Sequence, residues 1–118
     1  MADVLVINSM VRQFRRASLV YEWGQAQEDD NMERAGAKSL DQAIDVLDSC
    51  GPEGRMGLVR LLEDPEAYVR SMAAGYLLKV APEVALPALK KMYLSLDPRA
   101  RLLAATFLHA HERGEEPV

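Results

Sequence analysis

Two histidines and one cysteine are the side chains best suited to catalysis or metal binding near neutral pH: His109, His111 and Cys50. Helical residues two positions apart point about 200° away from each other, so the two histidines do not chelate one metal from a single face. Cys50 has no histidine near it in sequence, and the carboxyl end of a helix raises the pKa of a thiol rather than activating it. These residues predict a non-catalytic chain with no metal or cofactor.

The loop-like segments do not match known phosphate or calcium loops. Residues 51–54 have glycines at both ends but neither the lysine nor the following Ser or Thr of a phosphate-binding loop. Residues 28–30 are acidic but lack the glycine and the final glutamate of a calcium loop. A small basic cluster is expected to be a solvated face, with phosphate binding as the alternative; it consists of Arg12, Arg15 and Arg16.

The charge distribution is uneven along the chain. The net charge is −4, and residues 1–50 carry nine acidic against five basic side chains, whereas residues 51–118 carry nine of each. A nucleic-acid binder normally needs a basic stripe to neutralise phosphates, so we expect no nucleic-acid partner. The sequence shows no leader pattern, no apolar run long enough for a membrane span and only one cysteine, which together predict a cytoplasmic protein that does not bind membranes.

The acid excess has a helical spacing. If residues 30–48 form one helix, five carboxylates fall within roughly a third of its circumference at about 100° per residue. They are Asp30, Glu33, Asp41, Asp45 and Asp48. Such an acidic ridge is either a solubilising face or a docking surface for a basic protein, where complementary charge speeds encounter and fixes register.

The hydrophobic period is helical nearly everywhere, and no strand pattern competes with it. We therefore predict an all-α fold of about six helices, forming one domain over residues 1–112 with a solvated tail over residues 113–118. Asp64-Pro65 and Asp97-Pro98 are each read as a helix N-cap followed by proline at the first helical position. We expect a turn over residues 24–29 and helices over residues 30–48, 53–63 and 83–95. The apolar side of the last helix is expected to consist of Leu102, Leu103, Thr106 and Phe107.

An internal repeat links the two Asp-Pro segments. Arg70 and Arg101 lie 31 positions apart, and Ala73-Ala74 pairs with Ala104-Ala105 at the same offset. This Asp-Pro, Val-Arg, Ala-Ala, Leu pattern resembles the HEAT-like helical repeat in its short bacterial form. The chain is also similar to a bacterial family of domains of unknown function with that fold, and the matching stretches include residues 11–14, 51–55 and 61–65. The resemblance implies a short HEAT/ARM-like alpha-alpha superhelix in which Asp64, Arg70, Asp97 and Arg101 are scaffold residues.

The expected function is protein binding, because short helical stacks present helix edges to partners. The sharper hypothesis is a bacterial immunity or antitoxin-like protein whose acidic ridge neutralises a basic toxin. The alternatives are an adaptor or assembly subunit, including a homodimer through the exposed side of the N-terminal helix, and a HEAT-like enzyme, which we expect least. Tyr21 and Trp23 are expected to close one end of the core, with interface hot spots as the alternative.

Overall fold

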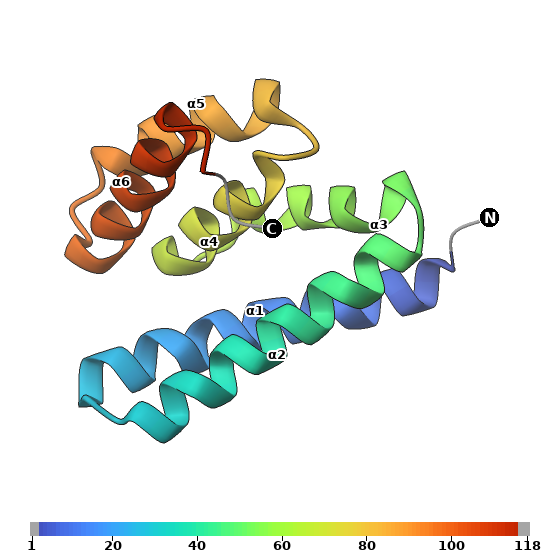
Figure 1. Ribbon diagram of the computed structural model, residues 1–118, viewed down its shortest axis with the longest axis horizontal. Coiled ribbons are helices and arrows are strands. Elements are labelled where there is room, and N and C mark those ends of the chain that lie inside the picture. Colours follow the sequence, from blue (N-terminus) through green and yellow to red (C-terminus); the bar gives the residue numbers. More distant parts are fainter. Residues whose placement is uncertain (1–2, 116–118) are drawn as a thin grey trace. The chain divides into compact units, whose positions relative to one another are not determined.

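The computed structural model describes residues 3–115, and every regular element in that range is helical (Figure 1). The elements are α1 (Val4–Gln27), α2 (Asp30–Ser49), α3 (Pro52–Met56), the 3-10 helix η1 (Gly57–Glu63), α4 (Ala67–Leu77), α5 (Pro82–Tyr93) and α6 (Pro98–Glu112). The prediction of an all-α chain with about six helices is confirmed, whereas the finer prediction of a HEAT-like superhelix stays a prediction. None of the described helices combines the length and the apolar character needed to cross a bilayer.

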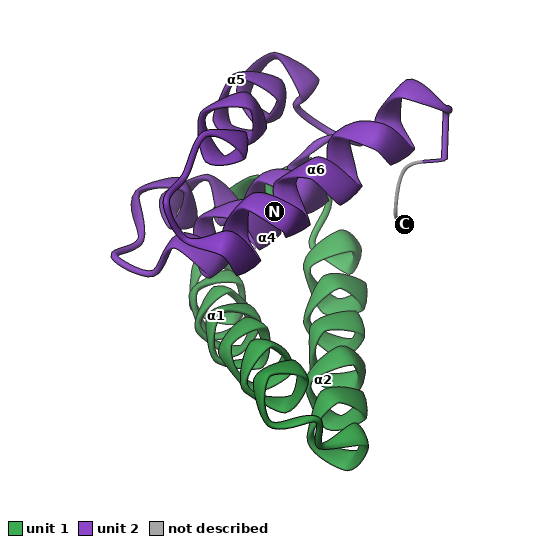
Figure 2. Cartoon of the chain, turned by 90° about the vertical axis from the view of Figure 1, so that its left-hand side faces the viewer, with its two compact units in different colours: residues 1–57 green, residues 58–118 purple. Residues whose placement is uncertain are grey.

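The chain packs as two compact units, residues 1–57 and 58–118 (Figure 2). The first contains α1, α2 and α3, and the second contains η1 beyond Gly57 together with α4, α5 and α6. The prediction of one domain over residues 1–112 stays a prediction. Of the expected tail, residues 116–118 lie outside the described residues, and α6 ends at Glu112.

In the first unit α1 and α2 form a long helical hairpin (Figure 1). The connection is shorter than the expected turn over residues 24–29, because α1 continues through Gly24 to Gln27. Glu28 turns the chain with a left-handed φ of 53°, and the Asp29 carboxylate then caps α2 by accepting hydrogen bonds from the amides of Asn31 and Met32, both at 3.1 Å.

Two glycines let the backbones of α1 and α2 approach closely near this connection. A Cβ added to Gly24 would lie 2.5 Å from the amide nitrogen of Glu33, and one added to Gly36 would lie 2.6 Å from that of Tyr21. Real Cβ atoms do not come this close, so the hairpin needs glycine at both positions. The role of Gly24 is therefore close packing and not the turn that the sequence suggested.

The segment after α2 differs from the predicted helix over residues 53–63. Gly51 adopts a φ of 82°, which is easy for glycine, and the chain re-enters a helix at Pro52. The α-helical part ends at Met56, and Gly57 begins the 3-10 helix η1. Glycine is a poor helix former, which fits a change of helix type at this residue.

In the second unit α4, α5 and α6 pack against one another. Ala73, Ala74 and Ala104 are fully buried, and the hydroxyl of Ser71 donates a hydrogen bond of 2.9 Å to the carbonyl of Ala100. Small side chains let helices pack at short range. They also explain one wrong expectation: Leu102 and Thr106 are exposed, because the buried side of α6 is built from Ala100, Ala104 and Phe107.

The two copies of the repeat make the same hydrogen bonds at positions 31 residues apart. Arg70 donates to the carbonyl of Asp64 at 2.6 Å, and Arg101 donates to the carbonyl of Ser95 at 3.0 Å, six residues upstream in both cases. The side chains of Asp64 and Ser95 each accept a hydrogen bond from the amide two residues later. Both arginines thus hold the entry to their own helix, as expected of scaffold residues.

This register corrects the role predicted for Asp64-Pro65. Asp97 is the N-cap of α6 with Pro98 in its first turn, as expected, but α4 begins at Ala67 with Glu66 at its N-cap. The equivalent of Asp64 is therefore Ser95, which stands in the turn before the helix. Asp64 is nearly buried there and closes this turn instead of capping α4.

Candidate functional site

The five predicted acidic residues of α2 have different environments. Asp30, Asp41 and Asp45 are exposed, and none of the three carboxylates makes a hydrogen bond or ion pair with another residue between positions 3 and 115. Glu33 is half-buried. Asp48 is engaged in an ion pair, so the structure leaves three of the five as open carboxylates.

Asp48 forms an ion pair with Arg55 of α3. The two ends of the guanidinium meet the two carboxylate oxygens, with Nε to Oδ1 at 2.9 Å and Nη2 to Oδ2 at 2.6 Å. Arg55 is only 2% exposed, so its charge depends on this bidentate contact. The pair joins the end of α2 to α3, which is a structural role for Asp48.

Basic residues interrupt the acidic ridge. At about 100° per residue, Arg34 and Lys38 fall on the same side of α2 as Asp41 and Asp45. Both are exposed, and Arg34 also donates a hydrogen bond of 2.9 Å to the side chain of Asn31. The ridge is therefore a mixed surface with a modest acid excess, and its strongest part is the pair Asp41 and Asp45, one helical turn apart.

Glu33 faces the first helix at the level of Tyr21. Partial burial raises the pKa of the Tyr21 phenol above its ordinary value of 10.0, and the negative charge of Glu33 raises it further. Both effects disfavour the phenolate.

We expect the ultraviolet titration of Tyr21, obtained as the difference between the wild type and Tyr21→Phe, to have its midpoint above pH 10.0. Because the pKa of Tyr21 is higher in the folded than in the unfolded protein, the neutral phenol contributes to the stability of the fold. This contribution is fully present below the unfolded-state pKa and is lost as pH rises through the folded-state pKa. Glu33→Gln should move the midpoint down without reaching the ordinary value, since burial remains. A midpoint that Glu33→Gln leaves unchanged would show that the carboxylate does not act on the phenol.

The expectation that Trp23 closes the core is wrong. Trp23 is 58% exposed, whereas Tyr21 is half-buried beside Gly36. The reason is the length of α1: the helix runs on past Trp23 to Gln27, so this position points out from a helix instead of covering an end of the core. Together with the exposed Leu5 near its start, Trp23 makes the outer side of α1 partly apolar.

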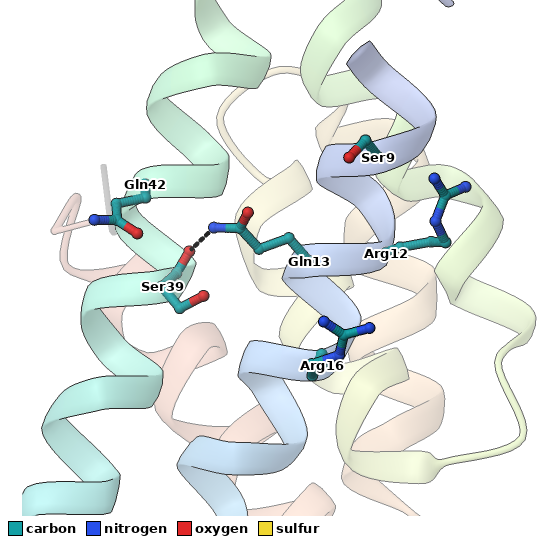
Figure 3. Close-up of a pocket in the computed structure, with 6 residues that line it drawn as sticks. All are labelled: Ser9, Arg12, Gln13, Arg16, Ser39 and Gln42. Atoms are coloured by element: carbon teal, nitrogen blue, oxygen red, sulfur yellow. Dashed lines mark hydrogen bonds between the residues drawn. The ribbon is translucent and has the colours of Figure 1, made fainter. Parts of the chain in front are cut away.

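A polar groove of about 400 Å³ lies between α1 and α2 (Figure 3). Its lining residues are Ser9, Arg12, Gln13, Arg16, Ser39 and Gln42. The Gln13 side chain reaches across and donates a hydrogen bond of 3.1 Å to the carbonyl of Ser39. Sequence reasoning had singled out Arg12 and Arg16, but the residues of α2 that face them could not be known without the register of the hairpin.

An apolar surface marks the end of α5 in the second unit. Leu94 is 80% exposed, Leu96 is 96% exposed and Tyr93 is 48% exposed. Tyr93 and Leu94 also border a groove of about 300 Å³ that continues along α6; its other lining residues are Lys90, Leu108, His109 and Glu112. The predicted helix over residues 83–95 included Leu94, whereas α5 ends at Tyr93 and leaves Leu94 and Leu96 in the connection before the Asp97 cap.

The residues considered first for chemistry belong to different units of the chain. Cys50 is half-buried at the end of α2, whereas His109 and His111 lie in the last turn of α6. Within residues 3–115 no three side chains of His, Cys, Asp or Glu are grouped in a way that could hold a metal ion. His109 instead borders the apolar groove.

Comparisons of the chain with protein-family models, with curated proteins and with solved structures found no match. The similarity to a bacterial HEAT-like family therefore stays a prediction from the sequence.

Proposed function

We propose that this chain is a non-catalytic protein-binding module whose partner is a basic protein. The observation that carries the proposal is the exposure of three large apolar side chains within four positions, Tyr93, Leu94 and Leu96. Contiguous apolar surface with a polar rim is typical of protein interfaces. Lys90, His109 and Glu112 supply such a rim around the adjoining groove.

Apolar burial would provide most of the affinity. Removing apolar area from water contributes roughly 25 cal/mol per Å². The groove beside Tyr93 and Leu94 offers a concave seat for an apolar side chain of the partner, the arrangement in which interface hot spots are found. Leu96, outside the groove, would extend the contact.

The charge of the chain supports a basic partner. The net charge is −4, and the open carboxylates of α2 are Asp30, Asp41 and Asp45. Exposed charges contribute more to the rate of association than to affinity, and salt screens them. A toxin that the chain neutralises is the sharper form of this proposal.

The test is a pulldown from native host extract at low and moderate salt, followed by rebinding of the purified partner. We expect one basic protein in a one-to-one complex. The double variant Leu94→Ser/Leu96→Ser should abolish binding at both salt levels, whereas Asp41→Asn/Asp45→Asn should weaken it mainly at low salt. Val80→Ser, which changes another exposed apolar residue of the same unit, is the control and should bind normally. Recovery of the chain alone at both salt levels would reject the proposal.

A second candidate function is that of a self-assembling subunit. The observation in its favour is the apolar character of the outer side of α1, where Leu5 is exposed along with Trp23. Solution mass separates the two functions, since self-assembly gives a dimer that Trp23→Ser dissociates. A monomer at high concentration would remove this candidate.

A further inference from the structure

The groove between α1 and α2 is unusual in the chemistry of its lining. All six lining side chains can donate hydrogen bonds, and none of them is acidic or apolar: Ser9, Arg12, Gln13, Arg16, Ser39 and Gln42. Asp41 and Asp45 belong to the same helix as Ser39 and Gln42 but are not part of the lining. The groove is therefore a local positive site in a chain with a net charge of −4.

The two arginines are not neutralised within the protein. Arg12 and Arg16 are exposed and lie one turn apart on α1, and neither guanidinium group makes a hydrogen bond or ion pair with another residue in the described range. Like charges at this spacing destabilise a helix by a few tenths of a kcal/mol. A bound anion would remove this repulsion. The neighbouring Arg15 differs, since it is half-buried and has its own interaction.

The walls of the groove are held by Gln13. Its side chain spans the space between the helices and is tied to the main chain of α2 at Ser39, as Figure 3 shows. This bond fixes one donor-bearing side chain before any ligand arrives, which lowers the entropy lost on binding. Arg12 points away from α2 in the same view. It is exposed, and rotamer changes of exposed side chains take picoseconds to nanoseconds, so it is able to turn toward a ligand.

From this lining we infer that the α1–α2 groove binds a small ligand carrying a phosphate group. Guanidinium groups bind phosphate oxygens through paired N–H donors, and the serine and glutamine side chains would donate to the remaining oxygens or to hydroxyls of the ligand. A volume of about 400 Å³ lies within the usual range of small-molecule sites. The absence of apolar lining side chains favours a hydrophilic ligand, such as a sugar phosphate, over one with a large apolar body.

The experiment is a calorimetric titration of the full chain at low ionic strength with inorganic phosphate, pyrophosphate and ribose 5-phosphate. We expect saturable one-to-one binding of at least one probe with a dissociation constant of millimolar or tighter. Arg12→Gln/Arg16→Gln should weaken it at least tenfold. Tighter binding of ribose 5-phosphate than of inorganic phosphate would identify a sugar phosphate as the ligand, and the reverse order would identify the free ion.

The matched control is Lys91→Gln/Arg99→Gln, which removes the same charge from exposed positions on α5 and α6. It should retain binding, and both double variants should keep the thermal midpoint of the wild type. Equal weakening by the two double variants would reduce the effect to net charge and overturn the inference. So would the absence of binding by all three probes, or a single-stranded oligonucleotide that binds more tightly than they do through the same arginines.

Discussion

Gly54→Ala is expected to lower the free energy of unfolding by about 3 kcal/mol, the upper end of the usual cost of overpacking. Gly54 lies in α3, where an added Cβ would collide with the carbonyl oxygen and carbon of Leu47 at the end of α2. The obstacle is backbone, so no change of side-chain rotamer relieves it. Either α3 moves away from α2 or the last turn of α2 opens.

Urea unfolding of the two proteins measures this loss, with Glu53→Ala as the control. Glu53 is the exposed neighbour of Gly54 in the same short helix, and its replacement should change stability by no more than about 0.5 kcal/mol. A Gly54→Ala protein as stable as the control would mean that α3 does not dock on α2 as described.

Asp48→Asn has the second largest expected effect, a loss of about 2 kcal/mol. Breaking a buried ion pair by removing one partner commonly costs about 3–5 kcal/mol, and the lower figure allows for the half-exposure of Asp48. Arg55 would keep its charge in a buried position, and the replacement amide would offer it one acceptor oxygen in place of the two carboxylate oxygens.

The matched controls are Asp41→Asn and Asp45→Asn, which make the same chemical change at exposed positions of the same helix. Both should leave the free energy of unfolding within about 0.5 kcal/mol of that of the wild type. Adding Arg55→Met to Asp48→Asn should recover part of the loss, since the buried charge is then absent as well. Equal losses of stability in the three single Asp→Asn variants would contradict the distinction between Asp48 and the carboxylates without an ion-pair partner.

The acidic ridge shows where sequence reasoning succeeds and where it stops. Helical spacing correctly placed Asp30, Asp41 and Asp45 on the surface, because exposure of a helix face follows from the period of the helix itself. The fate of Asp48 depends on Arg55, which reaches it only because the chain reverses at Gly51. A partner supplied by another element has no signature in the spacing of one helix.

The same limit applies to the helix starts and to the polar groove. The two Asp-Pro pairs have different structural roles, because Asp64 lies in the turn before α4, at the position that Ser95 has in the second copy. The dipeptide alone does not distinguish a cap from a turn that lies two residues earlier. In the groove, Arg12 was noticed from its neighbours in sequence, but that Ser39 and Gln42 line the same groove follows only from the register of the two helices.

The matching arginine contacts have a consequence for how this chain tolerates changes in length. Each copy contains its own arginine contact, since Arg70 and Arg101 both donate a hydrogen bond to a carbonyl within their own segment. A duplicate of residues 64–94 placed after Leu94 would bring its own arginine, its own turn and the small residues of α4, and residue 95 would follow it in the original register. An insertion between Asp64 and Arg70, or between Ser95 and Arg101, would instead separate an arginine from the carbonyl that it binds. Changes of length are therefore expected to be tolerated between the two arginine contacts and not within them.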